Sequence, residues 1–387
     1  MRVPVYKKFL AKTLYGFETV LSEELKNLGA ENISIKNRAV EFEGNKRILY
    51  LTNLSVRTAL RILVPIGSFR FKDTKDFYSK SKHINWLHYL SFKNTFAIDA
   101  VVNSKLFLHT KYPALKLKDA IVDRIRDETG KRPNVDTENP QIRIHLHIQN
   151  NISNIYLDSS GRSLHLRGYR IEGGSAPLNE VLAAGMILLT DWNGNTNFVD
   201  PMCGSGTLVA EAAMIAKNIP PNLNRDNFGF MNWDDFDKPL YDKIKTELQE
   251  KIRKPDIKIA GSDISGKAVS IARKNIKRAG LENDVTLEVK DFKQLSKIGE
   301  SGIIVTNPPY GERLKSEDLI GLYKSFGDVL KQKFDGYQAW VLSGDKTAIK
   351  HIGLRASKKI TLYNGSIECK FHKFELYKGT KKNKPAN

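Results

Sequence analysis

A glycine-containing turn with an acid ahead of it is the feature that most restricts the fold of this chain of 387 residues. The apolar run that ends at Val199 predicts a strand, and residues 208–216 predict a helix. Gly204 and Gly206 let the backbone turn sharply and approach a ligand closely. The third glycine of the dinucleotide fingerprint is missing, which favours a ligand without phosphates. The predicted cofactor contacts of this turn are Asp200, Cys203, Gly204, Ser205 and Gly206.

Two further acids follow predicted strands. Asp263 comes after the strand expected at 257–260, and Asp291 after that at 285–289. Open α/β sheets bind ligands at the carboxyl ends of their strands, so we expect the three acids to share one cofactor. Asp200 would accept from an amino group, Asp263 from ribose hydroxyls and Asp291 from an adenine amine, as S-adenosylmethionine (SAM) requires. Ile264 and Phe292 would pack near the adenine.

The run Asn307-Pro308-Pro309-Tyr310 begins at the end of a predicted buried strand. The Asn307 side-chain oxygen and the Pro308 carbonyl can accept the two protons of an exocyclic amine on a base. The prolines stiffen the loop, and Tyr310 offers a flat face to the base. Asn307 is also predicted to contact the cofactor. Together with the glycine turn, this run predicts methyl transfer from SAM to a base, and guanine N2 and adenine N6 both remain open.

Charge and cysteine content narrow the class of protein. The chain has 62 basic and 43 acidic side chains, a net charge of +19, which favours a nucleic-acid partner. A basic proteome would produce the same surplus. The two cysteines form no zinc-binding pattern, so no metal is expected. There is no signal peptide or run of 18 apolar residues, which predicts a cytoplasmic protein without a membrane span.

Hydrophobic periodicity predicts several domains. Residues 1–48 form a small α+β unit, and 49–158 alternate helices and strands, including a short strand at 62–64 and a helix at 116–126. Residues 159–177 read as a polar linker. Residues 178–387 have the pattern of a doubly wound α/β domain, with an insertion at 218–255 between Gly204 and Asp263.

Basic and aromatic residues interleave in the N-terminal half. Phe107 and Tyr112 are candidates for stacking on unpaired bases, and residues 69–72 form a second candidate site. His145 and His147 are expected on the surface of a strand. The predicted RNA-binding residues are Lys105, His109, Lys111, Lys116, Arg167 and Arg170.

The chain resembles the THUMP-domain RNA guanine-N2 methyltransferases. The matching runs are 164–170, 176–180, 200–207, 261–263 and 307–314. The resemblance implies a ferredoxin-like unit, a THUMP RNA-binding domain and a Rossmann-like class I SAM methyltransferase domain, within which the insertion is normal. It also implies a guanosine in structured RNA as substrate, 23S rRNA first and tRNA second. Larger members carry a second catalytic domain, so one methylation is expected here.

Two other functions fit the same residues. An adenine-N6 methyltransferase acting on DNA or RNA would use the same Asn-Pro-Pro-Tyr run. A non-catalytic RNA-binding assembly factor would keep the fold alone, although intact Asp200, Asp263 and Asn307 argue against it. Nothing in the sequence indicates an oligomeric state or the target nucleotide.

Overall fold

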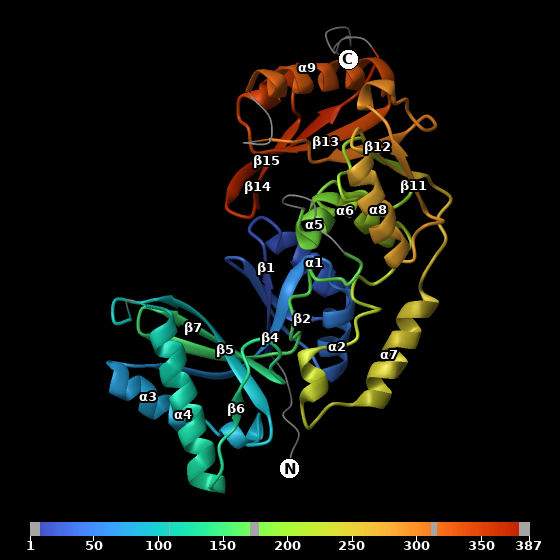
Figure 1. The fold of residues 1–387 in the computed structure, drawn as a ribbon. Helices are drawn as coiled ribbons and strands as arrows, with labels where there is room; N and C mark the ends of the chain where they lie inside the picture. Colours follow the sequence, from blue (N-terminus) through green and yellow to red (C-terminus); the bar gives the residue numbers. More distant parts are fainter. Residues whose placement is uncertain (1–7, 108, 171–177, 311–315, 379–387) are drawn as a thin grey trace. The chain divides into compact units, whose positions relative to one another are not determined.

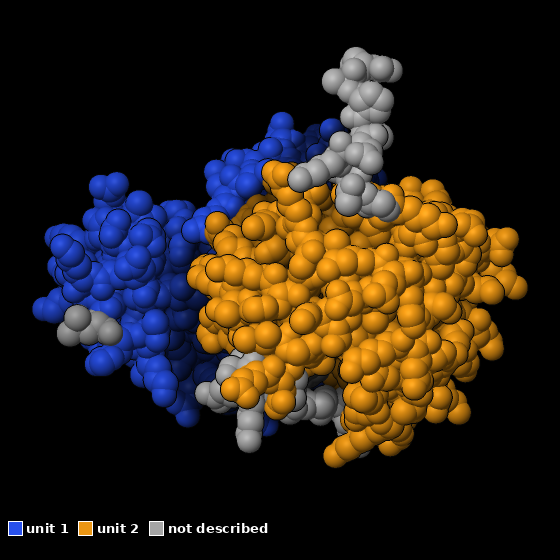
Figure 2. All heavy atoms as spheres, turned by 90° about the horizontal axis from the view of Figure 1, so that it is seen from above, with its two compact units in different colours: residues 1–13, 22–164, 225–245 blue, residues 14–21, 165–224, 246–387 orange. Residues whose placement is uncertain are grey.

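The computed structural model describes residues 8–107, 109–170, 178–310 and 316–378 (Figure 1). The chain divides into two compact units, which Figure 2 shows in different colours. Unit 1 comprises residues 1–13, 22–164 and 225–245, and unit 2 comprises residues 14–21, 165–224 and 246–387. No helix within the described ranges is long and apolar enough to cross a membrane.

Unit 1 contains a sheet of eight strands in the order β2-β3-β1-β4-β8-β7-β5-β6. Strand β5 pairs in parallel with β6 and β7, and the other neighbours are antiparallel. The two parts predicted for residues 1–48 and 49–158 therefore contribute to one continuous sheet. The strands are β1 (Lys8–Thr13), β2 (Glu31–Lys36), β3 (Ala39–Glu43), β4 (Ala59–Arg70), β5 (Thr95–Asn103), β6 (Asn134–Val135), β7 (Ile142–Gln149) and β8 (Ile152–Asp158).

The helices of unit 1 bury one apolar face. In α4, Leu117, Ala120, Ile121 and Ile125 recur at helical spacing and are buried, and Gly130 ends the helix in the left-handed conformation. The helices are α1 (Glu18–Asn27, which crosses into unit 2), α2 (Lys46–Ser55), α3 (Thr74–His83), the 3-10 turn η1 (Trp86–His88) and α4 (Lys111–Thr129).

Several details of unit 1 differ from the sequence-based expectations. The strand expected at 62–64 extends over the whole of β4, with an irregular register between Pro65 and Gly67. Phe107 is buried against Phe71 and Phe77, so its ring is a core side chain and cannot stack on RNA. His145, expected on the surface, is buried with its Nε2 3.1 Å from the Asp158 carboxylate.

Part of the insertion at 218–255 belongs to unit 1. The Phe230 ring, in the 3-10 turn η2 (Gly229–Asn232), stacks on Tyr50 of α2 at 4.5 Å. Arg225 donates to the Ser160 and Ser163 carbonyl oxygens, each at 3.1 Å. Lys46 forms an ion pair with Asp235 at 3.2 Å. This segment, which comes from the C-terminal half of the chain, therefore completes the core of unit 1.

Replacing Phe230 with alanine should lower the free energy of unfolding by about 3–5 kcal/mol, since a buried ring would be lost from the core. Thermal and urea unfolding would measure the loss. Tyr112→Ala, which removes a ring that is 44% exposed, should change stability by less than about 1 kcal/mol. Equal stability of the two variants would show that the insertion does not support unit 1.

Unit 2 contains a sheet of seven strands in the order β11-β10-β9-β12-β13-β15-β14. Strands β9 to β13 are parallel, and β15 is antiparallel to both of its neighbours. The doubly wound pattern predicted from residue 178 onward is thus present, with an antiparallel pair at one edge. The strands are β9 (Asn197–Asp200), β10 (Ile259–Asp263), β11 (Val285–Val289), β12 (Gly302–Thr306), β13 (Tyr337–Ser343), β14 (Lys358–Asn364) and β15 (Ile367–Glu375).

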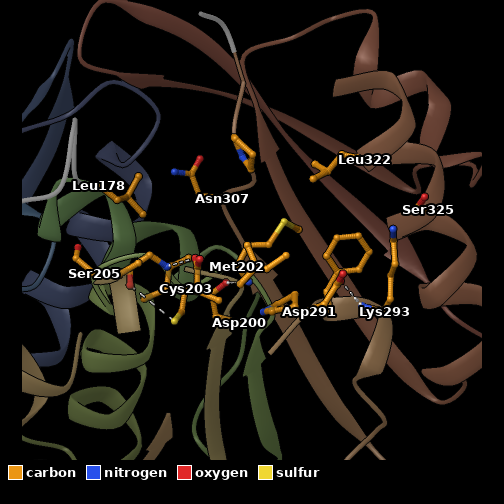
Figure 3. A pocket seen from close by; sticks show the side chains of 18 of the residues that line it. Leu178, Asp200, Met202, Cys203, Ser205, Asp291, Lys293, Asn307, Leu322 and Ser325 are labelled. Carbon is orange, nitrogen blue, oxygen red and sulfur yellow. Dashed lines mark hydrogen bonds between the residues drawn. The ribbon is translucent and has the colours of Figure 1, made fainter. Parts of the chain in front are cut away.

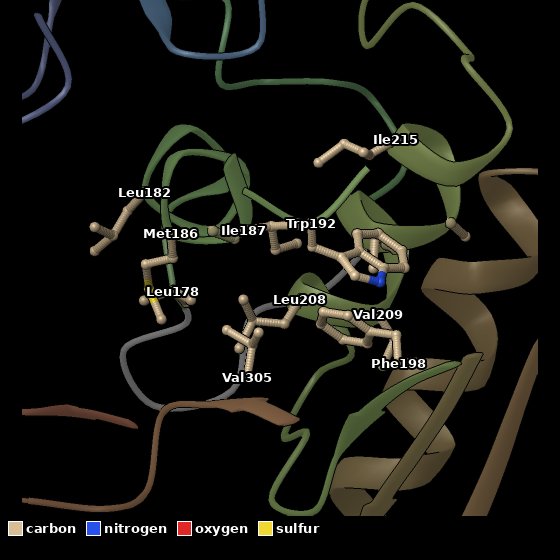
Figure 4. Packing of buried hydrophobic residues seen from close by; sticks show 14 of the residues in the cluster. Leu178, Leu182, Met186, Ile187, Trp192, Phe198, Leu208, Val209, Ile215 and Val305 are labelled. Carbon is tan, nitrogen blue, oxygen red and sulfur yellow. The ribbon is translucent and has the colours of Figure 1, made fainter. Parts of the chain in front are cut away.

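Two clusters of buried apolar side chains join helices to the sheet in this unit. One joins α5, α6, β9 and β12 around Trp192 and Phe198 (Figure 4). The other joins α9 to β13 around Tyr323 and Phe326. Every residue of α6 is buried, which explains its alanine-rich sequence. The helices are α5 (Glu180–Leu188), α6 (Thr207–Ala216), α7 (Lys238–Glu250, begun in unit 1), α8 (Gly266–Arg278), η3 (Phe292–Gln294), α9 (Ser316–Lys333) and η5 (Ala348–Ile352).

Candidate active site

A cavity of about 800 Å³ lies at the carboxyl ends of the parallel strands of unit 2 (Figure 3). It receives side chains from the ends of β9, β10 and β12 and from the segment after β11. Most of the site residues predicted from the sequence line this one cavity. They are Asp200, Cys203, Gly204, Ser205, Asp263, Ile264, Asp291, Phe292, Asn307 and Pro309. The glycine turn and the Asn-Pro-Pro corner, which lie far apart in the sequence, therefore meet.

Other residues that line the cavity were not predicted from the sequence. Leu178 contributes from the segment before α5, and Met202 from the turn. Leu322 and Ser325 contribute from α9, and Lys293 from η3 (Figure 3). Helix α9 follows the Asn-Pro-Pro-Tyr run closely in the sequence, but no pattern indicates which of its faces turns toward the cavity.

Two glycines shape the turn between β9 and α6. Gly204 has φ +53°, and a Cβ added there would enter open space at the cavity. Gly206 has φ +81°, and its added Cβ would lie 3.0 Å from the Ala272 Cβ of α8. The first position therefore keeps the cavity open, and the second allows α6 to approach α8. Asn275 fixes the turn by donating to the Ser205 carbonyl oxygen at 3.0 Å.

Asp263 joins the end of β10 to the glycine turn. One carboxylate oxygen accepts from the Gly204 backbone N–H at 2.9 Å, and the other accepts from the Ser265 N–H at 2.9 Å. Each oxygen has a second lone pair, and the residue lines the cavity. Asp263 can therefore hold the turn in place and still accept from a ligand.

Asp200 is buried at the end of β9. Its Oδ1 accepts from the Thr306 hydroxyl at 2.8 Å and from the Met202 N–H at 3.3 Å. Burial raises the pKa of Asp200 to about 7, and these two hydrogen bonds only partly oppose the effect. Among the described residues no cation forms an ion pair with it. A cationic ligand group in the cavity would supply the missing partner.

Asp291 directly precedes the 3-10 turn η3, and its carboxylate caps the turn. Its Oδ1 accepts from the Lys293 N–H at 2.9 Å. Phe292 is buried and packs edge-on against Phe326 of α9 at 5.4 Å. Ile264, by contrast, is 74% exposed at the cavity wall. An apolar side chain so exposed at a cavity is well suited to contact a planar ligand.

Cys203 occupies the turn as a packing residue. The side chain is 6% exposed, and burial raises the pKa of its thiol. Its backbone N–H donates to the Ser262 carbonyl oxygen at 2.8 Å. A thiol held in this protonated form is a poor nucleophile.

Asn307 directly follows the buried strand β12 and points its amide into the cavity region (Figure 3). Its side-chain oxygen Oδ1 is buried and has no hydrogen-bond partner within the described part of the chain. An unsatisfied buried acceptor is costly, so such atoms commonly mark functional sites. The oxygen is available to a donor brought by a ligand.

Tyr310 does not occupy the position expected of it. The ring is 8% exposed and belongs to the apolar cluster around Phe198, and Tyr310 and Pro308 are absent from the described cavity lining. The Tyr310 hydroxyl accepts from the Asn364 side-chain amide at 2.7 Å. The expectation that this ring stacks on a base is corrected, because both its face and its hydroxyl are engaged within the protein.

Arg167 and Arg170 are also corrected. Arg167 has a side chain only 1% exposed and lies 3.6 Å from the Glu211 carboxylate. Arg170 donates to the Leu178 carbonyl oxygen at 2.7 Å and to the Thr207 hydroxyl at 3.2 Å, and it pairs with Glu180 at 3.5 Å. Both guanidinium groups are therefore engaged by protein groups at the cavity wall and at α6. They are not available to bind RNA.

The other predicted RNA-binding residues lie in unit 1. Lys105, His109 and Lys111 are exposed just before or at the start of α4. Lys116 is half-buried, with its Nζ 5.8 Å from the centre of the exposed Tyr112 ring. Lys116 also borders a polar groove of about 600 Å³, whose other basic residues are Lys118, Arg126 and Arg132.

The fold and the site together define a class I, Rossmann-like methyltransferase domain. The chain belongs to the RMKL-like methyltransferase family, whose methyltransferase domain matches residues 167–373. A THUMP domain matches residues 71–158, and the RlmL ferredoxin-like domain matches residues 8–63. The fold class predicted from the sequence is confirmed.

Individual relatives cover nearly all of the chain. The ribosomal RNA large subunit methyltransferase K/L of Syntrophotalea carbinolica is 39% identical over 383 residues, which are 95% of this chain. The chain spans only 53% of the length of that relative. The crystal structure of SMU.472 complexed with SAH is 32% identical, with a TM-score of 0.88 over 98% of this chain and all of that one. A predicted N6-adenine-specific DNA methylase from Listeria monocytogenes is 29% identical, with a TM-score of 0.86 over 96% of each chain.

Proposed function

We propose that this protein transfers a methyl group from SAM to the exocyclic N2 amine of a guanosine in large-subunit rRNA. The observation that carries the proposal is the buried, unpaired Oδ1 of Asn307 beside three acids in one cavity of the described chain. The rRNA methyltransferase K/L relative and the SAH complex of SMU.472 support the substrate and the cofactor. We also propose that it acts in the cytoplasm.

The residues of the cavity fit SAM. Asp200 would hold the ammonium group, Asp263 the ribose hydroxyls and Asp291 the adenine amine, with Ile264 and Phe292 against the adenine. The bound sulfonium supplies the methyl group. The assignment rests on the buried carboxylate of Asp200, which lacks a cationic partner among the described residues, and on the open space at Gly204.

Asn307 Oδ1 and the Pro308 carbonyl oxygen would accept the two amine protons of the target base. These hydrogen bonds localise the nitrogen lone pair, which is otherwise delocalised into the ring. The nitrogen–carbon bond forms as the sulfur–carbon bond breaks, and the extra amine proton passes to solvent. A general base is not required, so alignment by Asn307 and the rigid proline pair is the protein's main contribution.

RNA binding is assigned to unit 1. The THUMP match and the exposed Lys105, His109 and Lys111, with Lys116 behind them, support phosphate contacts there. We propose domains at residues 1–48, 49–158 and 178–387, with a linker at 159–177 between the second and the third. Residues 225–245, within the third range, pack into unit 1.

Methylation of purified rRNA with labelled SAM, followed by nucleoside analysis, tests the function. The product should be N2-methylguanosine, and a matched deletion strain should lack it at one position of its 23S rRNA. Label recovered in no RNA nucleoside would reject the proposal, and label recovered only from tRNA would move the target to tRNA.

An adenine-N6 methyltransferase is the second candidate. The Listeria monocytogenes relative is described as a predicted N6-adenine-specific DNA methylase, and the Asn-Pro-Pro-Tyr run suits either amine. The same nucleoside analysis, run on DNA as well as RNA, would show N6-methyladenosine or its deoxy form if this candidate is right.

Replacing Asp263 with alanine should raise the dissociation constant of SAM about ten- to hundredfold, because the variant loses both a ribose acceptor and the bond that holds Gly204. Isothermal titration calorimetry would measure it. Asp345→Ala is the matched control, since Asp345 also accepts from two backbone N–H groups after a strand but lies outside the described cavity lining. An unchanged constant for the Asp263 variant would exclude the ribose role.

A further inference from the structure

The end of the β14–β15 hairpin lies against the Asn-Pro-Pro-Tyr corner. Asn364, the last residue of β14, donates its side-chain amide to the Tyr310 hydroxyl at 2.7 Å. Gly344 fits between Tyr310 and Ile367, since a Cβ there would lie 3.0 Å from both side chains. The hairpin end therefore sits at the carboxyl edge of the sheet, where Asn307 also lies.

Two tyrosines gather at this hairpin end. The Tyr15 and Tyr363 rings meet edge to face, with centroids 5.6 Å apart at 86°. Tyr15 is 46% exposed, and Tyr363 is half-buried. Gly16, at φ +90°, holds Tyr15 against β14, because an added Cβ would lie 3.0 Å from the Thr361 carbonyl oxygen. The backbone at Gly16 therefore passes close to β14, and the exposed Tyr15 ring lies beside Tyr363.

Lysines flank the tyrosine pair. Lys370 on β15 donates to the Thr361 hydroxyl of β14 at 2.6 Å and is 38% exposed. Lys346 follows β13 and has a side chain 76% exposed. Glu368 lies 3.6 Å from Lys370 and 3.8 Å from Lys346, which neutralises one charge of the group. Lys359 on β14 is exposed, and the alternation of the strand places it on the same face as Tyr363.

The "hairpin rim" is the surface formed by Tyr15, Tyr363, Lys346, Lys359 and Lys370. We propose that the hairpin rim binds the RNA strand that flanks the target nucleotide, with bases stacking on the tyrosines and phosphates meeting the lysines. The inference rests on the proposed function. A base taken into the cavity leaves its neighbours unstacked, and the exposed Tyr15 ring with the half-buried Tyr363 ring offers them new partners at the same edge of the sheet.

The lysines of the hairpin rim favour RNA as the occupant. Glu368 lies near two of the three lysines, and the nearby carboxylates of Glu18 and Asp345 accept from backbone N–H groups. The exposed ammonium groups of Lys346 and Lys359 are open to the phosphates of a polyanion. Aromatic stacking accepts any base, so the rim would grip the strand without reading its sequence. The basic residues of unit 1 would then supply a separate set of contacts.

The test is the affinity for a 23S rRNA transcript of the Tyr15→Leu/Tyr363→Leu double variant. Its affinity and its kcat/KM for RNA should both fall about tenfold or more, since each lost stack costs about that much. The Tyr15→Phe/Tyr363→Phe variant keeps both rings and should match the wild type. Tyr377→Leu is the matched control, because Tyr377 is 47% exposed but follows the opposite end of β15.

Two further measurements distinguish the loss of RNA contacts from damage to the cavity. The SAH dissociation constant and the melting temperature should stay unchanged in the double leucine variant, which would exclude a damaged cavity. Lys346→Gln/Lys370→Gln should reduce the salt dependence of RNA binding by about one ion per lost contact.

Wild-type affinity for RNA in the double leucine variant would overturn the inference. Equal losses in the phenylalanine and leucine variants would also overturn it, because the rings would then act only through their hydroxyl groups. If the wild type binds the transcript but methylates no RNA, the proposed function fails while the affinity measurements still decide the role of the rim.

Discussion

Replacing Asn307 with alanine should lower the rate of methyl transfer by about 10²–10³-fold and leave the affinity for SAH within about threefold of the wild type. The side-chain oxygen is a buried acceptor with no described partner, so removing it costs the fold little. It would remove an acceptor that the amine needs only as the nitrogen begins to attack. Single-turnover methylation and calorimetry with SAH would measure the two quantities.

Asn307→Asp is the informative companion variant. A carboxylate also offers an oxygen acceptor at this position, so it should retain more activity than alanine. Turnover near the wild-type rate in the alanine variant would remove Asn307 from the mechanism. A large loss of SAH affinity in that variant would instead place its main role in cofactor binding.

Replacing Asp200 with asparagine should weaken SAM binding strongly and at the same time stabilise the free protein. Burial raises the pKa of Asp200 to about 7, so the folded state retains a proton that the unfolded chain releases near its ordinary value of 3.8. The free energy of unfolding therefore falls as the pH rises from about 4 to 7. Asparagine has no charge to bury, and at pH 8 the variant should gain about 2–4 kcal/mol. Urea unfolding at several pH values would measure this gain.

The same carboxyl should make cofactor binding depend on pH. An ammonium group pairs with the ionised form, which dominates only above about pH 7. The affinity for SAM should therefore rise by about tenfold between pH 6 and pH 8 in the wild type. The Asp200→Asn variant has no carboxyl to ionise, so its weaker affinity should stay nearly constant over this range. A pH-independent wild-type affinity would show that Asp200 does not hold the ammonium group.

The sequence alone was enough to locate those parts of the cavity lining that lie within one short segment. The acid, the two glycines and the following helix could be located from the residue pattern alone, because Gly204 and Gly206 require conformations that other residues rarely adopt. Asp263 and Asp291 could be found in the same way, since each lies at or just beyond the end of an apolar strand. All of these except Gly206 line the cavity.

Prediction failed where the decisive contact comes from a distant segment. Tyr310 is buried because Asn364 and Gly344 surround it, and neither lies near it in the sequence. Arg167 looked like a surface cation, but Glu211 of α6 pairs with it in the interior. Pro65 and Gly67 hid the length of β4, because a proline and a glycine are normally signs that a strand has ended.

The sequence by itself determined the residues on which the proposed chemistry depends: the acids at strand ends, the glycine turn and the asparagine with its proline pair. These features are local, since backbone preference and residue type fix them. The tertiary structure alone decided which side chains are free to act, because burial depends on segments that meet only in the fold. It turned a tyrosine and two arginines into packing residues, left the Asn307 oxygen without a described partner, and brought Tyr15 into contact with Tyr363.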